Sequence, residues 1–505
     1  MTTTTIEPLD PIDSAAKPAV ESSGGRGSHA MRWWVLAVLG LSQLMVVLDA
    51  TVVNIALPEA QLSLGFSDAD RQWVVTAYAL AFGSLLLLGG RLSDLFGRRT
   101  TFLIGLAGFA VASAVGGAAT SFEMLVAARA GQGVFGALLA PAALSLLTVT
   151  FTEPRERAKA FGIFGAIAGA GGAIGLLLGG FLTEYASWRW AMYVNLIFAA
   201  VAMVGAALLL AKHVSNVRPK LDIPGTLSVT AALFSIVYGF SQAESQGWAD
   251  ASTISWLTAG VILLGVFAYL QNRVANPLMP LRIILDRTRG ASYLAIFVVG
   301  AGMFAVFLFL TYYMQLILGY SPIITGVAFL PMVAAMITSS VTSSNVLLPR
   351  FGARILMTSG MLIGAAGMLV LTQIEVDSNY ALHILPGLVL MGLGLGAAMA
   401  TAFQGATSAV HHDDAGVASA MVNTMQQVGG SIGTALLSTI AASAAADFMT
   451  GRTASALTLA QAQVASFTAT FWWATGIFAV GAVISALLLR DEVPAPSEGE
   501  LVMAH

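Results

Sequence analysis

Long apolar stretches separated by short polar segments run along the chain from about residue 33 to residue 489. A helix that crosses the ~30 Å hydrocarbon core of a bilayer needs about 20 mostly apolar residues. The stretches approach or exceed this length and lack the alternation of a membrane β-strand, so they predict helices. The predicted spans, fourteen in all, are Trp33–Leu57, Trp73–Gly89, Thr100–Ala119, Phe122–Val149, Lys159–Thr183, Trp188–Leu210, Ile223–Ser241, Ile254–Leu270, Ala291–Leu318, Ile323–Leu348, Ile355–Gln373, Leu382–Val410, Gly416–Ala441 and Phe467–Leu489.

The composition excludes a water-soluble protein. Of the 505 residues, 57% are apolar and 10% are charged, whereas soluble domains have about 25% charged residues. The sequence has no cysteine, which excludes disulfides, thiolate metal sites and cysteine nucleophiles. A net charge of −3 gives no sign of a nucleic-acid partner. The sequence therefore predicts an all-α polytopic protein of the lipid bilayer. We expect that it is not an enzyme and needs no cofactor.

Basic residues favour one side of the predicted spans. If the N-terminus is cytoplasmic, most of the 23 lysines and arginines fall in inner segments. Arg71, Arg189 and Arg452 are the exceptions in outer loops, and Arg129 lies within a span. This bias follows the positive-inside rule. It predicts a multi-pass protein of the cell (inner) membrane with both termini in the cytoplasm.

A short motif recurs after 255 residues: Phe96–Arg99 and Phe351–Arg354 share the pattern Phe-Gly-x-Arg. At the same offset, Gly175 of the fifth span aligns with Gly430 of the thirteenth. Repeated halves with a substrate site between them are typical of secondary transporters. The predicted domains are a disordered cytoplasmic tail (1–31), an N-terminal six-helix half (32–211), an inserted two-helix segment (212–290), a C-terminal six-helix half (291–490) and a cytoplasmic tail (491–505).

An acidic residue within a span points to the energy source. No lysine lies in a nucleotide-binding pattern, which excludes ATP-driven pumping by this chain alone. Asp49 lies within the first span, and a carboxylate in lipid costs about 2.5–3.5 kcal/mol, so it is expected to face the bundle interior. There it is a candidate proton carrier or a contact for a cationic substrate. The alternative is a structural role, as an ion-pair or hydrogen-bond partner for a neighbouring helix.

Arg129 is the second ionisable residue within a span. Gln132 and Gly133 follow it on the same face of the fourth helix. Small residues let another helix approach closely while the guanidinium finds an acceptor. This pattern indicates either a role in proton coupling or a buried arginine that fixes helix packing. Arginine keeps its charge, so Arg129 is not expected to carry the proton itself.

The loop after the second span is short and strongly charged. We expect Asp94 to sit at the N-terminus of the thirteenth span, where unpaired N–H groups attract an anion, and so to close the cytoplasmic side. The alternative is topological: the positive charges keep the loop inside and Gly97 turns it. This predicted cytoplasmic gate motif comprises Gly90, Asp94, Gly97, Arg98 and Arg99.

Two further patterns have structural as well as functional interpretations. The segment His411–Asp414 contains four adjacent potential metal ligands, which rarely converge on one ion, so we expect a capping turn and no metal site. Glycines at four-residue spacing open one face of the fifth span for close helix packing or coupling. They are Gly171, Gly175 and Gly179.

Three motifs resemble those of the major facilitator superfamily, specifically its fourteen-span drug:proton antiporters. They are Leu48–Pro58, Gly90–Arg99 and Arg129–Gly133, and Asn276–Arg282 is also similar. The resemblance implies that Asp49 is a proton or cation site. It also implies that Asp94 and Arg98 belong to the cytoplasmic gate and that Arg129 joins the proton-coupling network. The fifth span departs from the family pattern, because Leu176 stands where the family has proline.

These observations together predict a secondary transporter. We expect a proton-coupled, monomeric exporter of hydrophobic or amphipathic, including cationic, compounds that works by alternating access. One alternative is a transporter of lipids or of a single endogenous metabolite. Another is a non-transporting membrane sensor or scaffold, which is disfavoured because the sequence has no sizeable soluble domain to pass on a signal.

Overall fold

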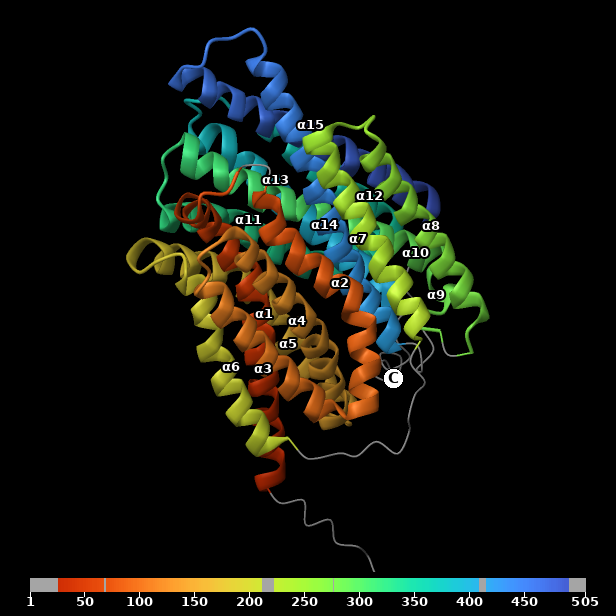
Figure 1. Ribbon diagram of the computed structural model, residues 1–505. Helices are drawn as coiled ribbons and strands as arrows, with labels where there is room; N and C mark the ends of the chain where they lie inside the picture. The colour runs from red at the N-terminus through yellow and green to blue at the C-terminus, as the bar shows by residue number, and fades with distance from the viewer. Residues whose placement is uncertain (1–25, 68–69, 211–221, 276, 408–414, 490–505) are drawn as a thin grey trace, which may run out of the picture.

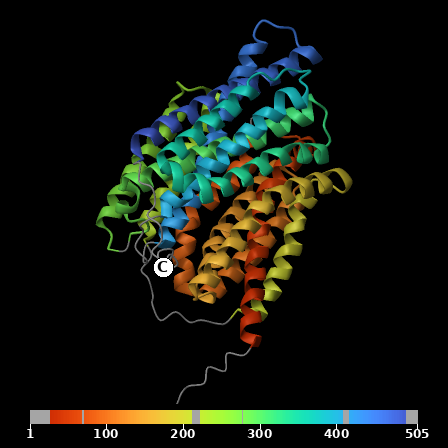
Figure 2. The ribbon, with the colours of Figure 1, turned by 180° about the vertical axis from the view of Figure 1, so that it is seen from behind.

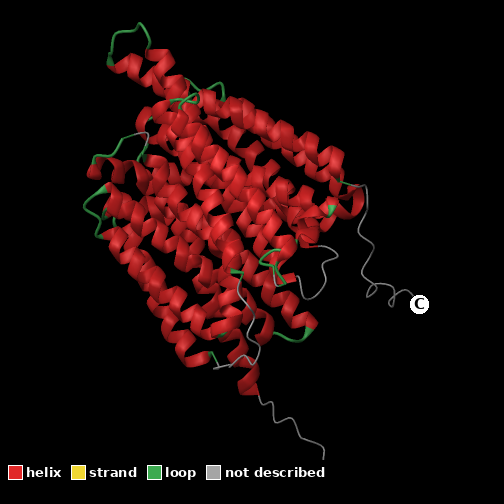
Figure 3. Ribbon diagram, turned by 45° about the vertical axis from the view of Figure 1, so that its right-hand side comes forward, coloured by secondary structure: helices red, strands yellow, loops and turns green. Residues whose placement is uncertain are grey.

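The computed structural model describes residues 26–67, 70–210, 222–275, 277–407 and 415–489. These ranges contain helices joined by short loops and no strand (Figure 3). The α-helices are α1 (Arg26–Leu64), α2 (Arg71–Phe96), α3 (Arg98–Gly117), α4 (Phe122–Thr150), α5 (Pro154–Tyr185), α6 (Trp190–Leu209), α7 (Ile223–Gln246), α8 (Ala251–Arg273), α9 (Leu281–Leu285), α10 (Arg287–Ala305), α11 (Pro322–Thr342), α12 (Leu348–Leu371), α13 (Leu385–Thr407), α14 (Ala415–Met449) and α15 (Ala456–Leu488). Short π-helical segments are η1 (Val306–Leu310), η2 (Tyr313–Ile317), η3 (Ser343–Leu347) and η4 (Tyr380–Ile384).

The described residues contain 11 helical segments long and apolar enough to cross a membrane. One of them, Pro322–Leu371, contains both α11 and α12. The helices α2 and α5 lie at predicted spans but are not among the 11. The all-helical membrane architecture predicted from the sequence is therefore confirmed, whereas the count of fourteen spans is not.

Several helices run beyond the predicted spans. The helix α1 begins at Arg26, inside the segment predicted to be a tail. The helix α14 has 35 residues, and α15 begins at Ala456, well before the predicted start at Phe467. Span limits drawn from hydropathy mark the apolar part of a helix, and these helices continue past it.

Two groups of helices lie side by side (Figures 1 and 2). In the first group α4 packs on α2 and α3, and α1 packs on α5 and α6. In the second group α13 packs on α11 and α12, and α14 packs on α10 and α15. The groups meet where α2 contacts α14 and where α5 contacts α11. The pair α7–α8 lies beside the first of these contacts, because α7 packs on both α14 and α2.

The repeated Phe-Gly-x-Arg motif forms the same kind of turn in both groups. Gly97 joins α2 to α3 with φ 88° and ψ 136°. Gly352 bends the first turn of α12 with φ 76° and ψ 165°. Residues with a Cβ atom rarely adopt such positive φ values, which explains why glycine occupies both positions. Further along, Gly175 packs on α1 and its counterpart Gly430 packs on Phe304 of α10.

Candidate functional site

Asp49 accepts hydrogen bonds from three side chains that come from α4 and α6. Its Oδ2 atom accepts from Arg129 Nη1 at 2.5 Å, which forms an ion pair. Its Oδ1 atom accepts from Gln132 Nε2 at 2.8 Å and from Asn195 Nδ2 at 2.7 Å. Each contact uses the carboxylate as an acceptor, which is the role of the ionised group.

The donors around Asp49 are themselves held in place. Arg129 Nη1 also donates to Gln132 Oε1 at 2.8 Å, and Arg129 Nε donates to the carbonyl oxygen of Val74 at 3.0 Å. The guanidinium lies 4.5 Å from the ring centroid of Tyr78, a favourable cation–π contact. Gln132 Nε2 donates a further bond to Ser113 Oγ at 2.8 Å. The Asp49 network, as we call it, comprises Asp49, Arg129, Gln132, Asn195 and Ser113.

The Asp49 network is buried at the centre of the first helix group. Each of its five residues is at most 1% exposed. They come from α1, α3, α4 and α6, and Val74 and Tyr78 add contacts from α2. Removing one partner of a buried ion pair is strongly destabilising, because the other charge stays in a low-dielectric interior. A proton on Asp49 would weaken its bond to Arg129, so the site can link a proton to the packing of five helices.

Small residues bring the surrounding helices close enough to form the site. A Cβ atom on Gly133 would meet the backbone of Tyr78 on α2. On α5, a Cβ on Gly175 would meet Thr51, and one on Gly179 would lie 2.9 Å from the Cα of Val52. A Cβ on Gly171 would lie 3.1 Å from the side chain of Val47. The glycines predicted to pack helices thus lie against the stretch of α1 that carries Asp49.

The fifth helix runs through the position where the family pattern has proline. The helix α5 is continuous from Pro154 to Tyr185, and Leu176 is fully buried within it. Gly326 of α11 lies against the carbonyl oxygen of Leu176. This position is therefore part of the contact between the two helix groups.

The gate motif lies at the turn between α2 and α3. Arg99 Nη2 donates to the carbonyl oxygen of Ala207 near the end of α6 at 2.8 Å, while Arg98 is half-buried. Gly90 has room beside it, because a Cβ atom added there would lie 3.8 Å from the Cβ of Pro141. The side chain of Asp94 and the residues before α14 lie outside the described part of the chain, so the predicted contact between them stays a prediction.

Polar contacts join the two helix groups at the ends of α1, α2 and α5 that were predicted to be outside. Tyr312 OH donates to Gln61 Oε1 at 2.7 Å, and the Arg71 guanidinium lies 4.3 Å from the Tyr312 ring centroid. Gln315 Nε2 donates to the carbonyl oxygen of Ile55 at 3.1 Å. The backbone N–H of Ile323 donates to Glu184 at 3.1 Å. We call Gln61, Arg71, Tyr312 and Gln315 the outer contact set.

Arginines predicted in outer loops have structural partners there. Arg71 belongs to the outer contact set. Arg189 donates to the carbonyl oxygens of Gly117 and Ala119 at the end of α3. Arg452 lies 3.6 Å from the Phe448 ring centroid. These contacts account for the exceptions to the charge bias.

Sequence reasoning missed three residues at the site: Asn195, Ser113 and Tyr78. A usable signal existed for Asn195, which is the only side-chain amide in α6. A lone amide in an otherwise apolar helix is expected to find a polar partner inside the bundle. Ser113 and Tyr78 offered no comparable signal, because serine and tyrosine are common in membrane helices.

The described residues contain no group of three or more His, Cys, Asp or Glu side chains that could hold a metal ion. The segment His411–Asp414, for which a capping turn was predicted, lies outside the described residues.

Comparison with known families assigns this helical membrane protein to a known class of transporters. The family model of the Major Facilitator Superfamily matches residues 39–434. This chain belongs to that superfamily and is a multi-pass membrane protein.

Two relatives show what this chain is similar to. The puromycin resistance protein pur8 of Streptomyces alboniger is 47% identical over 488 residues, which cover 96% of this chain and 97% of the relative. The cephamycin export protein CmcT of Amycolatopsis lactamdurans is 39% identical, covering 84% of this chain and 88% of the relative.

Solved structures agree on the fold. A bacterial homologue of the human lysosomal transporter Spinster matches with a TM-score of 0.63 and 18% identity, over 91% of this chain and 97% of that one. A POT family peptide transporter matches with a TM-score of 0.65 and 17% identity, over 93% and 99%. At this identity the likeness concerns the fold alone.

Proposed function

We propose that this protein is a proton-coupled exporter of hydrophobic or amphipathic drugs, including organic cations, that works by alternating access. The observation that carries the proposal is the buried Asp49–Arg129 ion pair within a chain of the Major Facilitator Superfamily. Relatives named for puromycin resistance and cephamycin export support antibiotics as the exported class. These relatives are resistance and export proteins, which agrees with a transporter that catalyses no reaction.

The proposed topology has fourteen spans. It counts Pro322–Leu371 as two crossings and adds α2 and α5 to the other segments. The turns at Gly97 and Gly352 then occupy equivalent places in two six-helix halves, 32–211 and 291–490, with α7 and α8 inserted between them. The protein lies in the cell membrane with both termini in the cytoplasm, and it acts as a monomer.

The state described is closed at its outer end. The outer contact set joins the halves at the ends of helices that the topology places outside. In this state the substrate site faces the cytoplasm, and Asp49 is paired with Arg129. For export, the outer contacts separate and the cytoplasmic ends close, with Asp94 and Arg98 of the gate motif contributing on that side.

Proton coupling follows from the Asp49 network. In the outward-facing state a proton from outside binds Asp49 and weakens its bond to Arg129, and the exported compound is released. The loaded protein returns to the inward-facing state, where the proton leaves and the Asp49–Arg129 pair forms again. The Arg129 guanidinium stays charged throughout and senses whether Asp49 is ionised.

The test is ethidium transport by purified protein in liposomes whose lumen is more acidic than the medium. The charge of ethidium is permanent, so a pH gradient alone does not trap it. Molecules inserted with their cytoplasmic face outward are expected to carry ethidium into the lumen as protons leave. Asp49→Asn is expected to abolish gradient-driven uptake.

The matched control is Asp447→Asn, which removes an exposed carboxylate of α14 far from the network and is expected to leave uptake unchanged. Uptake that survives in Asp49→Asn would contradict a coupling role for Asp49. Failure of the native protein to move ethidium, while it moves a labelled lipid or another compound, would contradict the proposed substrate class.

A further inference from the structure

The last two helices extend past the thickness of a membrane. At ~1.5 Å per residue, the 33 residues of α15 span roughly 50 Å, against ~30 Å for the hydrocarbon core. Counting outward from Leu488, Trp472 and Trp473 come after roughly 24 Å of helix, and they are 52% and 58% exposed. Exposed tryptophans are typical of the membrane–water interface. In the proposed topology, the first part of α15 therefore stands in the outer aqueous phase, where Figure 1 shows it projecting with the end of α14.

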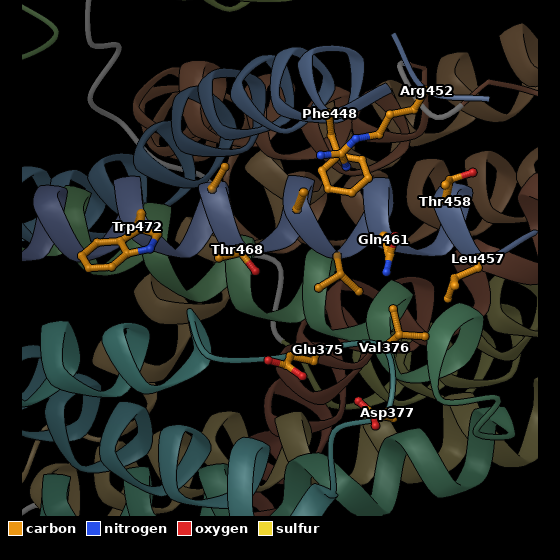
Figure 4. Close-up of a pocket in the computed structure, with 13 residues that line it drawn as sticks. Glu375, Val376, Asp377, Phe448, Arg452, Leu457, Thr458, Gln461, Thr468 and Trp472 are labelled. Carbon is orange, nitrogen blue, oxygen red and sulfur yellow. The ribbon is translucent and has the colours of Figure 1, made fainter. Parts of the chain in front are cut away.

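A large cavity, widely open to the protein surface, lies between this projection and the loop before η4. Its volume is about 1110 Å³, ample for a drug-sized molecule. One wall is the loop, with Glu375 and Asp377, and the other is α15, with Gln461 and Trp472 (Figure 4). All the lining residues belong to the second helix group or its loops, so the cavity is separate from the Asp49 network.

The acidic wall of the cavity is held in a fixed conformation. The buried Tyr313 donates its hydroxyl proton to the carbonyl oxygen of Glu375 at 2.6 Å. The backbone N–H of Glu375 donates to Ser378 Oγ at 2.8 Å, and Ile374 is anchored at 3% exposure. The loop backbone is thus held at Glu375 and Ser378, so a ligand would have to order the two acidic side chains but not this part of the backbone.

The two carboxylates have no hydrogen bond or ion pair with the described part of the chain. The cavity also contains one cation, Arg452, whose guanidinium lies over the ring of Phe448 at 3.6 Å. Figure 4 shows Arg452 beside Phe448, at the opposite edge of the cavity from Glu375 and Asp377. The acidic wall therefore keeps a surplus of one negative charge opposite the wall of α15, which is mostly apolar, carries Trp472 and has polar side chains at Thr458, Gln461 and Thr468.

We propose that this outer cavity is a second binding site, which takes organic cations with a planar aromatic body after they leave the central transport path. The proposal rests on the proposed function for its outer location and its substrate class. The cation is held by Glu375 and Asp377, and the aromatic body lies along α15 beside Trp472. A metal ion fits poorly, because the described residues bring no group of three or more acidic or histidine side chains together here.

The experiment measures protection of a single thiol in the cavity. The sequence has no cysteine, so Ala465→Cys places a unique thiol on the lining and Ala446→Cys places one on exposed α14 outside it. The rate of N-ethylmaleimide labelling is measured in detergent with and without propidium, a planar aromatic dication. We expect propidium to slow labelling about fivefold in Ala465→Cys and to leave Ala446→Cys unchanged.

Charge variants then test the acidic wall. In the Ala465→Cys background, Glu375→Gln with Asp377→Asn is expected to weaken propidium binding about three- to tenfold, because exposed charge pairs each contribute modestly. Asp447→Asn, which removes an exposed carboxylate outside the cavity, is expected to keep full protection. High salt is expected to weaken protection in the native background, since ions screen exposed charges.

Three outcomes would overturn the proposal. The first is absence of propidium protection in Ala465→Cys, and the second is equal protection with and without the two carboxylates. The third is slow labelling in phosphatidylcholine nanodiscs without propidium that becomes fast in detergent, which would assign the cavity to a lipid headgroup. None of these readouts requires transport, so they are distinguishable from failure of the proposed export.

Discussion

Neutralising both members of the Asp49–Arg129 pair should restore part of the stability that either single substitution removes, without restoring transport. In Asp49→Asn, Arg129 keeps its bonds to Val74 and Gln132 but loses the only carboxylate described within 4.0 Å of it. An uncompensated buried charge costs about 3–5 kcal/mol, and the same applies to Asp49 in Arg129→Gln. The double variant leaves two neutral amides able to bond to each other. It is therefore expected to be more stable than either single variant.

Stability is measured as the thermal midpoint of the detergent-solubilised protein, with size-exclusion chromatography as the readout. Transport is measured separately as ethidium uptake in liposomes. The expected ranking of midpoints is native, double variant, then the two single variants. Gradient-driven uptake is expected to be lost in all three variants, because each breaks the link between the proton and Arg129. If the thermal midpoint of the double variant falls by the sum of the two single-variant decreases, the idea that the pair acts as a unit is refuted.

Three further predictions concern packing and closure. Gly133→Val should lower the thermal midpoint sharply, because its side chain would enter the backbone of α2, whereas Gly172→Val, which meets nothing within 4 Å, should be tolerated. Gly97→Ala should cost about 1–3 kcal/mol through its φ of 88°, measured as a lower midpoint at unchanged expression. Tyr312→Phe removes the bond to Gln61, worth about 0.5–1.5 kcal/mol, and should increase labelling of thiols placed between the halves from the outer side.

The charged part of the site could be predicted from the sequence because charge inside an apolar span is costly. Asp49 and Arg129 stand out in α1 and α4 for that reason, and the structure brings them together at 2.5 Å. Asn195 lies 146 residues further along the chain than Asp49. It is the only side-chain amide in α6, but this signal alone does not identify its partner. Its role depends on where α6 packs, which no local pattern specifies.

The all-helical membrane fold was predictable in the same way, whereas the positions of the outer helix ends were not. Hydropathy detected only the apolar part of the last helix, from Phe467 onward. The helix α15 in fact begins at Ala456, with a capping box formed by Ser455 and Thr458. This polar signal marks a helix start in water, and a search for apolar stretches does not detect it. The outer cavity exists because of this extension, so it too was hidden from the sequence.

The most direct test of the central claim is to measure proton movement that a substrate drives. Native protein is placed in liposomes containing a trapped pH indicator, with no initial pH gradient, and ethidium is added outside at high concentration. Inward movement of ethidium is expected to drive protons out, so the lumen becomes alkaline in the native protein and stays unchanged in Asp49→Asn. Ethidium entry without any change of lumenal pH in the native protein would contradict proton-coupled export.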